Sequence, residues 1–414
     1  MRYDIAVVGG GAAGMCAAIS AGMGDRKLKI VVLEALDRVG KKLITTGNGR
    51  CNITNRDQRL CRYHGEDVGF AEKVFAKRGM EAAVRFFRSI GVEISFIEDG
   101  RAYPSGFQAS GVVDAMRFAL EENGIEVLTE AKVENIIPKK GSVILETAKG
   151  PVEASAVILA SGLLAGGPKT GSDGSVFGIL KKMGYKFSEP SPSIVQLKTP
   201  PEAVRPMKGI HFDCLVSLYN GKKPVRREFG ELLFTEYGLS GPPVLQVSRA
   251  VSKEKGKFEV SLDLACGTEM PELKKLLFRR REQLSLRASE DFLTGFLNKR
   301  VGQVILKLCG VSVGSVCGRI TDGQLEQIAN TIKDFRFPVT GTTGMSNAQV
   351  AAGGILVSEF FPETLESRRH PGIFAAGELL DIDGDCGGYN LQWAWSSALV
   401  ASENAVKLAK KRMK

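Results

Sequence analysis

The chain has 414 residues, of which 43% are hydrophobic and 25% charged, the proportions of an ordinary globular protein. At this length two or three domains are expected, and no apolar run approaches the roughly 20 residues that cross a bilayer. The first residues enter a strand at once, without the pattern of a secretion signal, so we expect a cytoplasmic protein without a membrane span.

Cysteine and histidine usage narrows the kinds of site that the chain can hold. The eight cysteines are scattered without a C-x-x-C pair, which fits a reducing compartment. His64, His211 and His370 are not spaced as metal ligands, so we expect neither a metal centre nor a Ser-His-Asp hydrolase. The net charge of +10 is spread along the chain in short clusters, which favours solvated surfaces over a nucleic-acid-binding patch.

The first forty residues have the pattern of a dinucleotide-binding unit. A strand, a glycine turn, a helix and a second strand follow one another at residues 3–8, 9–14, 15–21 and 28–33. Gly9, Gly11 and Gly14 have the G-x-G-x-x-G spacing, and Glu34 follows Gly14 by twenty positions. Gly11 leaves room for a pyrophosphate at the start of the helix, where free N–H groups favour an anion. The Glu34 carboxylate would accept hydrogen bonds from a ribose diol.

Residues 40–55 form the next segment, which is too rich in Gly, Asn and Thr for a core element. A loop of this length is usually functional, and its many free backbone N–H groups suit a phosphate or a flat polar ring. We therefore expect ligand contact, with a surface turn as the alternative. Cys51 has no second cysteine four or five residues later, so a dithiol flavin reductase is not expected.

The middle of the chain combines helices with short strands before it returns to the sheet. Residues 70–90 and 110–123 have amphipathic helical spacing, and 125–147 have the alternation of a small meander. The segment 156–162 is predicted to be a buried strand that ends on small residues, which would let the backbone approach a bound nucleotide.

Prolines clustered between residues 190 and 206 mark a domain boundary. Residues 191–268 have the period of strands, and 269–340 have helical spacing. We expect an inserted substrate or cap domain over 191–340, β-rich and then helical. It would interrupt a domain formed by 1–190 and 341–414.

The last seventy residues return to the α/β pattern and contain a second glycine turn. A short strand ends at Gly377-Glu378, and Gly388 precedes a helix of small residues from about 391 to 409. A dinucleotide held by both ends of the chain must have a second polar part beyond its pyrophosphate, which favours FAD over NAD alone. Glu378 would then meet the ribityl chain, and the final helix would point its positive end at the flavin pyrimidine.

These motifs resemble a bacterial flavoprotein family that includes aminoacetone oxidase and the clostridial 3-dehydro-bile-acid Δ4,6-reductase. The likeness covers nearly the whole chain and rests on residues 9–14, 40–55, 341–354, 364–367, 377–384 and 387–395. The last motif, Gly-Gly-Tyr-Asn-Leu-Gln-Trp-Ala-Trp, is specific. One departure is Ala-Ser-Gly at 160–162, where such folds often have Ala-Thr-Gly, and the serine keeps the hydroxyl.

The resemblance implies an α/β protein with a Rossmann-like FAD-binding domain of glutathione-reductase-type topology and an inserted domain. FAD would be bound non-covalently. The residues expected to contact FAD are Gly9, Gly11, Ala13, Gly14, Glu34, Lys42, Gly49, Arg50, Cys51, Asn52, Val133, Ser161, Gly162, Gly377, Glu378, Asp383, Gly388, Asn390 and Leu391. No catalytic acid or base is assigned, and Tyr389 is a weak candidate for a proton donor.

The resemblance leaves three functions open. The first is a reductase in which NAD(P)H reduces FAD and a conjugated C=C bond of a 3-oxo steroid or bile-acid-type substrate receives the hydride. No second G-x-G-x-x-G unit is present, so a nicotinamide would reach the flavin transiently through the substrate cleft. The basic surface suits a small anionic or CoA-linked substrate.

The second function is an amine oxidase, like aminoacetone oxidase, that returns electrons to oxygen as peroxide. The third is a flavoprotein that acts on tRNA or binds RNA through Arg279-Arg280-Arg281. Those arginines lack the interleaved aromatic residues that stack on bases, which argues against the third function.

Overall fold

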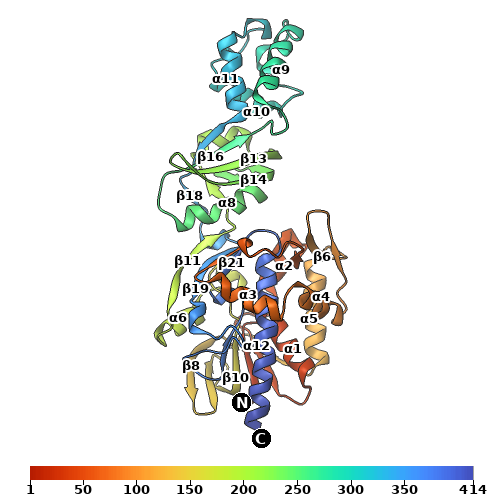
Figure 1. Cartoon of the computed structure of the whole chain (residues 1–414), viewed down its shortest axis with the longest axis vertical. Helices are drawn as coiled ribbons and strands as arrows, with labels where there is room; N and C mark the ends of the chain where they lie inside the picture. The colour runs from red at the N-terminus through yellow and green to blue at the C-terminus, as the bar shows by residue number, and fades with distance from the viewer. Residues whose placement is uncertain (414) are drawn as a thin grey trace. The chain divides into compact units, whose positions relative to one another are not determined.

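The computed structural model describes residues 1–413, which fold into two compact units. The first unit combines Met1–Pro192 with the chain from Met345 onward, and the inserted unit is Ser193–Gly344. The sequence predicts the two junctions after residues 190 and 340. The chain leaves the first unit once and returns to it, so both ends of the chain belong to that unit (Figure 1).

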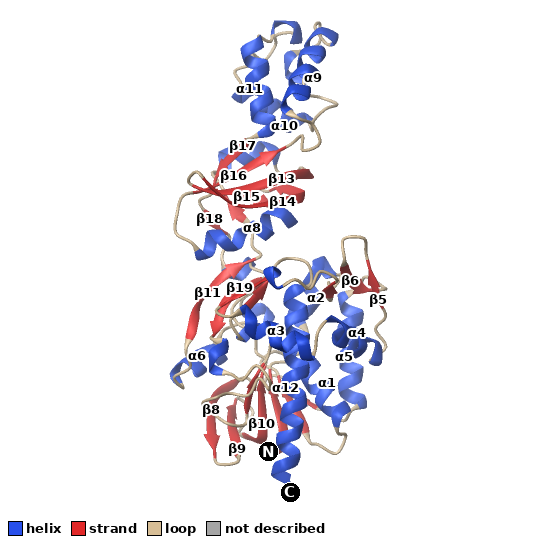
Figure 2. Ribbon diagram, viewed as in Figure 1, coloured by secondary structure: helices blue, strands red, loops and turns tan. Residues whose placement is uncertain are grey.

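A parallel sheet is the centre of the first unit (Figure 2). Its strands lie in the order β7-β2-β1-β10, and β20 pairs with the second half of β10, all in parallel. The ends of β1 and β10 and all of β2 are apolar and buried, as expected for a parallel sheet covered on both faces. β9 and β8 continue from the first half of β10 as an antiparallel meander. The predicted Rossmann-type α/β fold is confirmed.

The strands of the first unit are β1 Arg2–Val8, β2 Ile30–Leu33, β3 Thr54–Asn55, β4 Tyr63–Gly65, β5 Ile94–Phe96, β6 Arg101–Pro104, β7 Glu126–Leu128, β8 Val133–Lys139, β9 Ser142–Thr147, β10 Val152–Leu159, β11 Phe187–Ser193, β19 Val350–Ile355, β20 Ile373–Ala375 and β21 Ile382–Gly384. Its helices are α1 Ala12–Gly24, α2 Lys41–Thr45, α3 Val68–Lys77, α4 Met80–Ser89, α5 Ala109–Glu122, α6 Ser175–Lys182 and α12 Tyr389–Met413.

The first and last helices of this unit, α1 and α12, pack against each other and against β10 (Figure 1). Small side chains make the contact close, and the Ser402 hydroxyl donates to the Ser20 hydroxyl oxygen at 3.0 Å. α1 is apolar and almost wholly buried, as expected for a helix in the interior. Gly9 follows β1 and Gly377 follows β20, so the two glycine turns lie at the same edge of the parallel sheet.

Three predictions for the first unit differ from the structure. Residues 126–128 do not belong to the meander, because α5 carries the chain back along the sheet and β7 then pairs in parallel with β2. The helical segment 70–90 is two helices, α3 and α4, which separate at Gly79, a residue that weakens a helix interior. The final helix begins at Tyr389 rather than at 391 and continues to Met413.

The inserted unit contains an antiparallel sheet and a group of helices. The sheet has the order β17-β16-β13-β14-β15-β12-β18, and α8 packs against β13 and β14. Its strands are β12 Leu197–Lys198, β13 His211–Asn220, β14 Lys223–Phe234, β15 Gly238–Ser240, β16 Phe258–Asp263, β17 Phe335–Pro338 and β18 Gly341–Thr342. Its helices are α7 Pro201–Val204, α8 Pro242–Lys253, α9 Met270–Gln283, α10 Lys299–Leu308 and α11 Asp322–Lys333.

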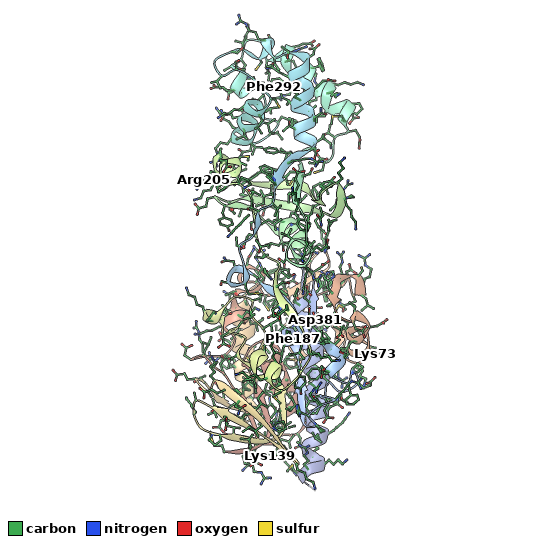
Figure 3. All side chains as sticks on the ribbon, turned by 90° about the vertical axis from the view of Figure 1, so that its left-hand side faces the viewer. Lys73, Lys139, Phe187, Arg205, Phe292 and Asp381 are labelled. Carbon is green, nitrogen blue, oxygen red and sulfur yellow. The ribbon has the colours of Figure 1, made fainter. Side chains whose placement is uncertain are left out.

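One apolar core runs through the inserted unit, from the sheet into the helices α9, α10 and α11. Phe292, which Figure 3 labels among these helices, is fully buried. The helical segment ends earlier than residue 340: Phe335 and Phe337 alternate with exposed residues and pair with β16. This alternation is the pattern of a strand. It was missed in the sequence analysis because the preceding helix dominates the hydrophobic pattern of the same stretch.

Within residues 1–413 no helix is long and apolar enough to cross a membrane. Within the same range, no three His, Cys, Asp or Glu side chains gather as ligands for a metal ion.

Candidate functional site

The turn between β1 and α1 presents the start of the helix without a side-chain cap. Gly11 is the residue before the helix and supplies no side-chain hydrogen bond to the first N–H groups. A Cβ atom on Gly11 would meet no atom within 4 Å, whereas one on Gly14 would lie 1.8 Å from the Gly9 carbonyl oxygen. Gly14 therefore lets helix and strand approach each other, and Gly11 leaves the start of the helix accessible to an anion.

Glu34, at the end of β2, is tied to this turn. Its Oε2 atom accepts a hydrogen bond from the Gly10 N–H at 2.7 Å, and its Oε1 atom accepts one from the Leu36 N–H at 2.8 Å. Burial raises the pKa of the Glu34 carboxyl, and these backbone donors act in the opposite direction. Each carboxylate oxygen keeps a lone pair, so the group can accept further hydrogen bonds from a ribose.

An ion pair joins the segment after β2 to the end of β20, 336 residues away. Lys42 Nζ lies 2.7 Å from Glu378 Oε2, and the Ala351 N–H donates to Glu378 Oε1 at 2.8 Å. A Cβ atom on the neighbouring Gly377 would lie 2.9 Å from the Ala13 Cβ. The structure therefore brings together three predicted contacts, Ala13, Lys42 and Glu378, that the sequence separates widely.

The loop that contains the Gly-Arg-Cys-Asn motif lies along the start of α12. The Trp395 indole N–H donates to the Ile53 carbonyl oxygen at 3.0 Å, and the Thr54 hydroxyl donates to Gln392 Oε1 at 2.5 Å. A Cβ atom on Gly388 would lie 2.5 Å from the Thr54 carbonyl oxygen. The close approach of loop and helix therefore requires glycine at position 388.

Asn52 provides the strongest sign that a ligand belongs at the start of α12. The residue is 9% exposed, and among residues 1–413 its buried Oδ1 atom has no hydrogen-bond partner. A Cβ atom on Gly388 would lie 2.9 Å from that oxygen, which places Asn52 beside the helix N-terminus. A buried amide oxygen without a partner costs roughly 1–3 kcal/mol. The pyrimidine ring of a flavin offers an N–H donor, so the residues present fit FAD.

The other predicted contacts around the sheet edge lie close to Glu34, Gly9 and Glu378. A Cβ atom on Gly9 would be 2.8 Å from the Ser161 Cα, and one on Gly162 would be 3.6 Å from Glu378 Oε2. Val133 begins β8, and the preceding Ala131 N–H donates to the Glu34 carbonyl oxygen at 2.8 Å.

Several predicted residues are placed in ways that the sequence does not reveal. Asn390 accepts from the Gly384 N–H at 2.8 Å and donates to the Gly384 carbonyl oxygen at 2.7 Å, so its amide holds the protein's own backbone. Cys51 is fully buried, and burial raises the pKa of its thiol to about 12. Asp383 is 1% exposed within β21. Gly49 and Arg50 are exposed in the loop, and Leu391 lies in the first turn of α12.

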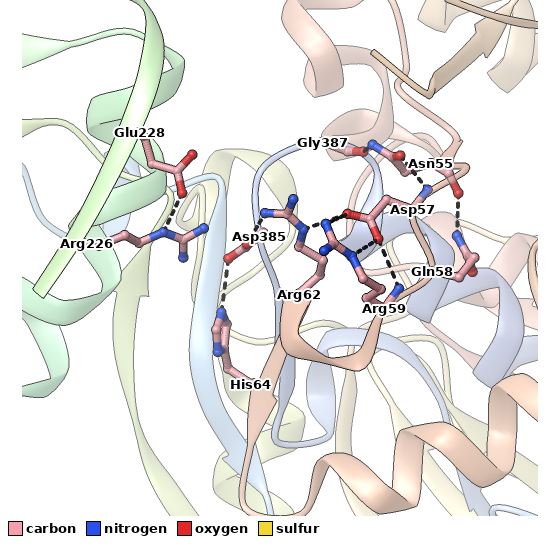
Figure 4. Close-up of polar contacts among 10 residues, drawn as sticks. All are labelled: Asn55, Asp57, Gln58, Arg59, Arg62, His64, Arg226, Glu228, Asp385 and Gly387. Carbon is pink, nitrogen blue, oxygen red and sulfur yellow. Dashed lines mark hydrogen bonds and ion pairs between the residues drawn. The ribbon is translucent and has the colours of Figure 1, made fainter. Parts of the chain in front are cut away.

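A charged network that the sequence analysis missed fixes the segment leading into α12 (Figure 4). The Asp385 side chain is 4% exposed and lies 3.0 Å from His64 Nε2 and 3.4 Å from an Arg62 terminal nitrogen. Arg62 Nε lies 2.9 Å from Asp57, and Arg59 pairs with the same carboxylate at 2.7 Å. The Arg59 and Arg62 guanidinium groups lower the pKa of the Asp57 carboxyl. The only sequence sign was the density of charged residues between positions 56 and 66.

The comparison with protein families decides the wider assignment. A family model described as the HI0933-like protein Rossmann domain matches residues 3–404. The chain belongs to the HI0933-like family. This HI0933-like protein is 34% identical over 407 residues to the 3-dehydro-bile acid delta(4,6)-reductase of Clostridium scindens, covering 97% of this chain and 99% of that protein. It is 26% identical over 416 residues to the ribosomal RNA dihydrouridine synthase of Escherichia coli, with 98% of each chain covered.

Solved structures support the same fold for the HI0933-like chain. It matches the 3-ketosteroid-delta4-(5alpha)-dehydrogenase of Rhodococcus jostii with a TM-score of 0.51 and 14% identity, covering 98% of this chain and 97% of that one. It matches the E. coli quinol fumarate reductase subunit FrdA with a TM-score of 0.53 and 18% identity, covering 99% and 71%. The family match, with its 34% identical reductase relative, and the Rossmann-type fold together indicate a flavoprotein oxidoreductase.

Replacing Asn52 with leucine distinguishes an effect on FAD binding from an effect on the stability of the apoprotein. Because the buried Oδ1 atom has no partner among the described residues, Asn52→Leu relieves its cost and is expected not to lower the free energy of unfolding of the apoprotein. It should weaken FAD binding roughly tenfold or more, measured by fluorescence titration.

The matched control for this prediction is Asn55→Leu. Asn55 donates to the Gly387 carbonyl oxygen at 3.0 Å and accepts from the Asp57 N–H at 2.9 Å, so this variant should unfold more easily. If the Asn52→Leu protein binds FAD as tightly as the wild type does, Asn52 does not contact the flavin.

Proposed function

We propose that the protein is an FAD-dependent reductase of C=C bonds conjugated to a carbonyl, in a 3-oxo steroid or bile-acid-type substrate, with NAD(P)H as electron donor. The observation that carries the proposal is the 34% identity over 97% of the chain to a reductase named for that reaction. The full-length match matters because it includes the inserted unit, where substrate selectivity would lie, as well as the nucleotide-binding elements.

The chain's own residues would hold FAD at four places. The start of α1 would face the pyrophosphate, Glu34 the adenosine ribose, and Lys42 with Glu378 the ribityl chain. The start of α12 and Asn52 would hold the pyrimidine edge. When bound, FAD would supply hydride transfer between the nicotinamide and the β-carbon of the enone.

We propose Tyr389 as the proton donor to the α-carbon, and the raised pKa of its phenol supports this role. The residue is 3% exposed, and burial raises the pKa of its phenol to about 12, with the nearby Arg62 guanidinium acting against the shift. A folded-state pKa above the usual 10.0 keeps the phenol protonated through neutral and moderately alkaline pH. The rate of C=C reduction should therefore hold through pH 10 and fall only as the pH approaches about 12.

Tyr389→Phe tests that role. We expect the C=C reduction step to slow roughly a hundredfold or more, while flavin reduction by NAD(P)H stays unchanged, measured by stopped-flow absorbance. Tyr63→Phe is the matched control, because the Tyr63 ring packs edge-on against Tyr389 at 5.7 Å and its buried hydroxyl has no partner among residues 1–413. Equal rates in both variants and the wild type would leave Tyr389 as a packing residue.

Anaerobic mixing tests the proposed function as a whole. NADH or NADPH should bleach the bound flavin, and a 3-oxo-4,6-dienoyl bile-acid conjugate should restore its colour with loss of the substrate's conjugation. A flavin that neither nicotinamide reduces in the presence of that conjugate would contradict the proposal. Peroxide release from aminoacetone would instead support the amine oxidase.

A second candidate is the reduction of uridine in RNA. Two relatives, 26% and 25% identical over nearly the whole chain, are named ribosomal RNA dihydrouridine synthases. The C5=C6 bond of uracil is also conjugated to a carbonyl, so the chemistry would be of the same kind. However, Arg280 and Arg281 of the predicted RNA-binding run donate to backbone carbonyl oxygens of Phe292 and Ile320 and are not free for phosphates. Dihydrouridine formation in ribosomal RNA from a strain that lacks the protein, after addition of the enzyme, would favour this candidate.

A further inference from the structure

Arg62 lies where two distant segments of the chain meet beside the start of α12. The Asp385 N–H donates to the Arg62 carbonyl oxygen at 2.8 Å, and this hydrogen bond extends the antiparallel pairing of β4 with β21. Asp385 belongs to the segment that leads into α12, which begins at Tyr389. The backbone therefore fixes the position of Arg62 relative to the first residue of the helix.

The Arg62 guanidinium is held on two sides by carboxylates. Its Nε atom lies 2.9 Å from Asp57 Oδ2, and a terminal nitrogen lies 3.4 Å from Asp385 Oδ2 (Figure 4). The Asp385 side chain is 4% exposed and the Arg62 side chain is 30% exposed, so solvent screens the contact between them only weakly. A planar guanidinium bound by two carboxylates has one preferred orientation, whereas a lysine ammonium in the same place would be a point charge.

The ring of Tyr389 lies near this guanidinium, with the Arg62 Cζ atom 6.0 Å from the ring centroid. The neighbouring backbone confines the ring: a Cβ atom on Gly384 would lie 2.6 Å from Tyr389 Cβ, and one on Gly387 would lie 3.3 Å from Tyr389 Cε2. Tyr63 packs edge-on against another side, and burial raises the pKa of its own phenol. The Tyr389 phenol therefore has little freedom to turn away from Arg62.

Charges of both signs act on the Tyr389 phenol. Burial raises its pKa to about 12, and Arg62 opposes burial more strongly than any other charged side chain does. The Asp57 and Asp385 carboxylates raise the pKa further, and the Arg59 guanidinium lowers it. Arg62 is therefore the cation best placed to offset a negative charge on this phenol.

We propose that Arg62 is a positioning residue for proton transfer, which holds the Tyr389 phenol in place and stabilises the phenolate left when the proton has gone to the substrate. The inference rests on the proposed reduction of a conjugated C=C bond. Once the β-carbon has received hydride, the α-carbon of the substrate enolate forms a bond to the phenol proton, and the electron pair of the O–H bond stays on the phenol oxygen. A proton from solvent then restores the phenol. A fixed positive charge close to the ring lowers the barrier because the negative charge develops during the transfer.

The ionisation of the Tyr389 phenol tests the electrostatic role without substrate or nicotinamide. A fluorinated tyrosine at this position is more acidic than tyrosine, and its fluorine NMR signal reports its protonation at moderate pH. With Arg62→Gln in the same FAD-bound protein, this phenol should become roughly tenfold less acidic. The matched control is Arg78→Gln, which removes an arginine that pairs with Glu403 of α12 at 2.7 Å. Glu403 lies roughly 20 Å along the helix from Tyr389, so the acidity should not change.

Arg62→Lys separates the charge from its placement. The ammonium keeps the positive charge but lacks the planar fork that Asp57 and Asp385 hold, so the acidity of the fluorinated phenol should stay within about threefold of the protein with Arg62. Both Arg62 variants should fold, because the two carboxylates keep Arg59 and His64 as ion partners.

The rate of C=C reduction tests the link to proton transfer. With NAD(P)H and a 3-oxo-4,6-dienoyl bile-acid conjugate, Arg62→Gln should slow the C=C step roughly tenfold and Arg62→Lys severalfold, with flavin reduction unchanged. Neither substitution should slow this step further in the Tyr389→Phe protein, because Arg62 acts through the Tyr389 hydroxyl. A substitution that damages the site in general would instead slow both backgrounds.

Three results would overturn the inference: unchanged acidity of the phenol in Arg62→Gln, an equal loss of acidity in Arg78→Gln, or equal rate losses with and without the Tyr389 hydroxyl. If Arg62→Gln does not fold, the rate losses of Arg62→Lys with and without that hydroxyl decide alone. A wild-type protein that reduces no enone would contradict the proposed function, while the fluorine titration would still show whether Arg62 acts on Tyr389.

Discussion

Replacing Gly14 with alanine should destabilise the protein and abolish flavin binding at physiological FAD concentrations. The new Cβ would lie 1.8 Å from the Gly9 carbonyl oxygen, a backbone atom that cannot rotate away. Either α1 moves off the sheet or the turn before it changes shape, and both remove the helix start from the pyrophosphate. We expect a loss of ~3 kcal/mol in the free energy of unfolding, near the upper end for single substitutions, measured by urea denaturation of the apoprotein.

Gly11→Ala is the matched control for this prediction. Its Cβ would meet no atom within 4 Å, so the stability of the apoprotein should stay within about 0.5 kcal/mol of wild type. The methyl group would still project from the start of α1, where we place the pyrophosphate, and FAD binding should weaken roughly tenfold. If Gly11→Ala binds FAD as wild type does, the pyrophosphate does not lie there.

The second large effect is expected from Gly388→Ala. Gly388 has φ of +98°, and a Cβ would lie 2.5 Å from the Thr54 carbonyl oxygen and 2.9 Å from Asn52 Oδ1. The substitution therefore strains the backbone and separates the start of α12 from the Gly-Arg-Cys-Asn loop. We expect a cost of roughly 2–3 kcal/mol and purified protein with little flavin, measured by the ratio of flavin to protein absorbance.

Gly124→Ala isolates the backbone strain from the clash. Gly124 also has a positive φ, +65°, but a Cβ there would meet nothing within 4 Å. This variant should lose about 1 kcal/mol and keep its flavin. Equal flavin loss in both variants would mean that instability, and not the separation of loop and helix, empties the protein of its cofactor.

The sequence predicted the α/β fold because its strongest signals are local. The strand, glycine turn, helix and second strand of the first thirty-four residues lie in one continuous stretch with a fixed spacing. Within the inserted unit, the change from strands to helices is predicted by the period of the hydrophobic residues alone. Sequence patterns were less informative where tertiary packing decides how a strand pairs. β7 has the composition of a meander strand, and it pairs in parallel with β2 only because α5 carries the chain back along the sheet.

For the candidate site, sequence motifs identified residues that lie at the site. They did not reveal the contacts that each of these residues makes. Lys42 and Glu378 carry no sign that they pair with each other, because their 336-residue separation closes only in the folded chain. Asn390 belongs to a specific motif, yet its amide is used to hold Gly384. The network of Asp57, Arg62 and Asp385 joins two segments that no periodicity relates.

If both ends of the chain together hold a single FAD, titration of the apoprotein with FAD will show it. FAD added to wild-type apoprotein should bind at one molecule per chain, with its fluorescence changed and its absorbance bands shifted. Glu34→Gln, at the first end, and Gly388→Ala, at the second, should each weaken that binding. A colourless wild-type protein that takes up no FAD would show that the chain is not a flavoprotein. Binding that depends on only one of the two ends would show that they do not hold FAD together.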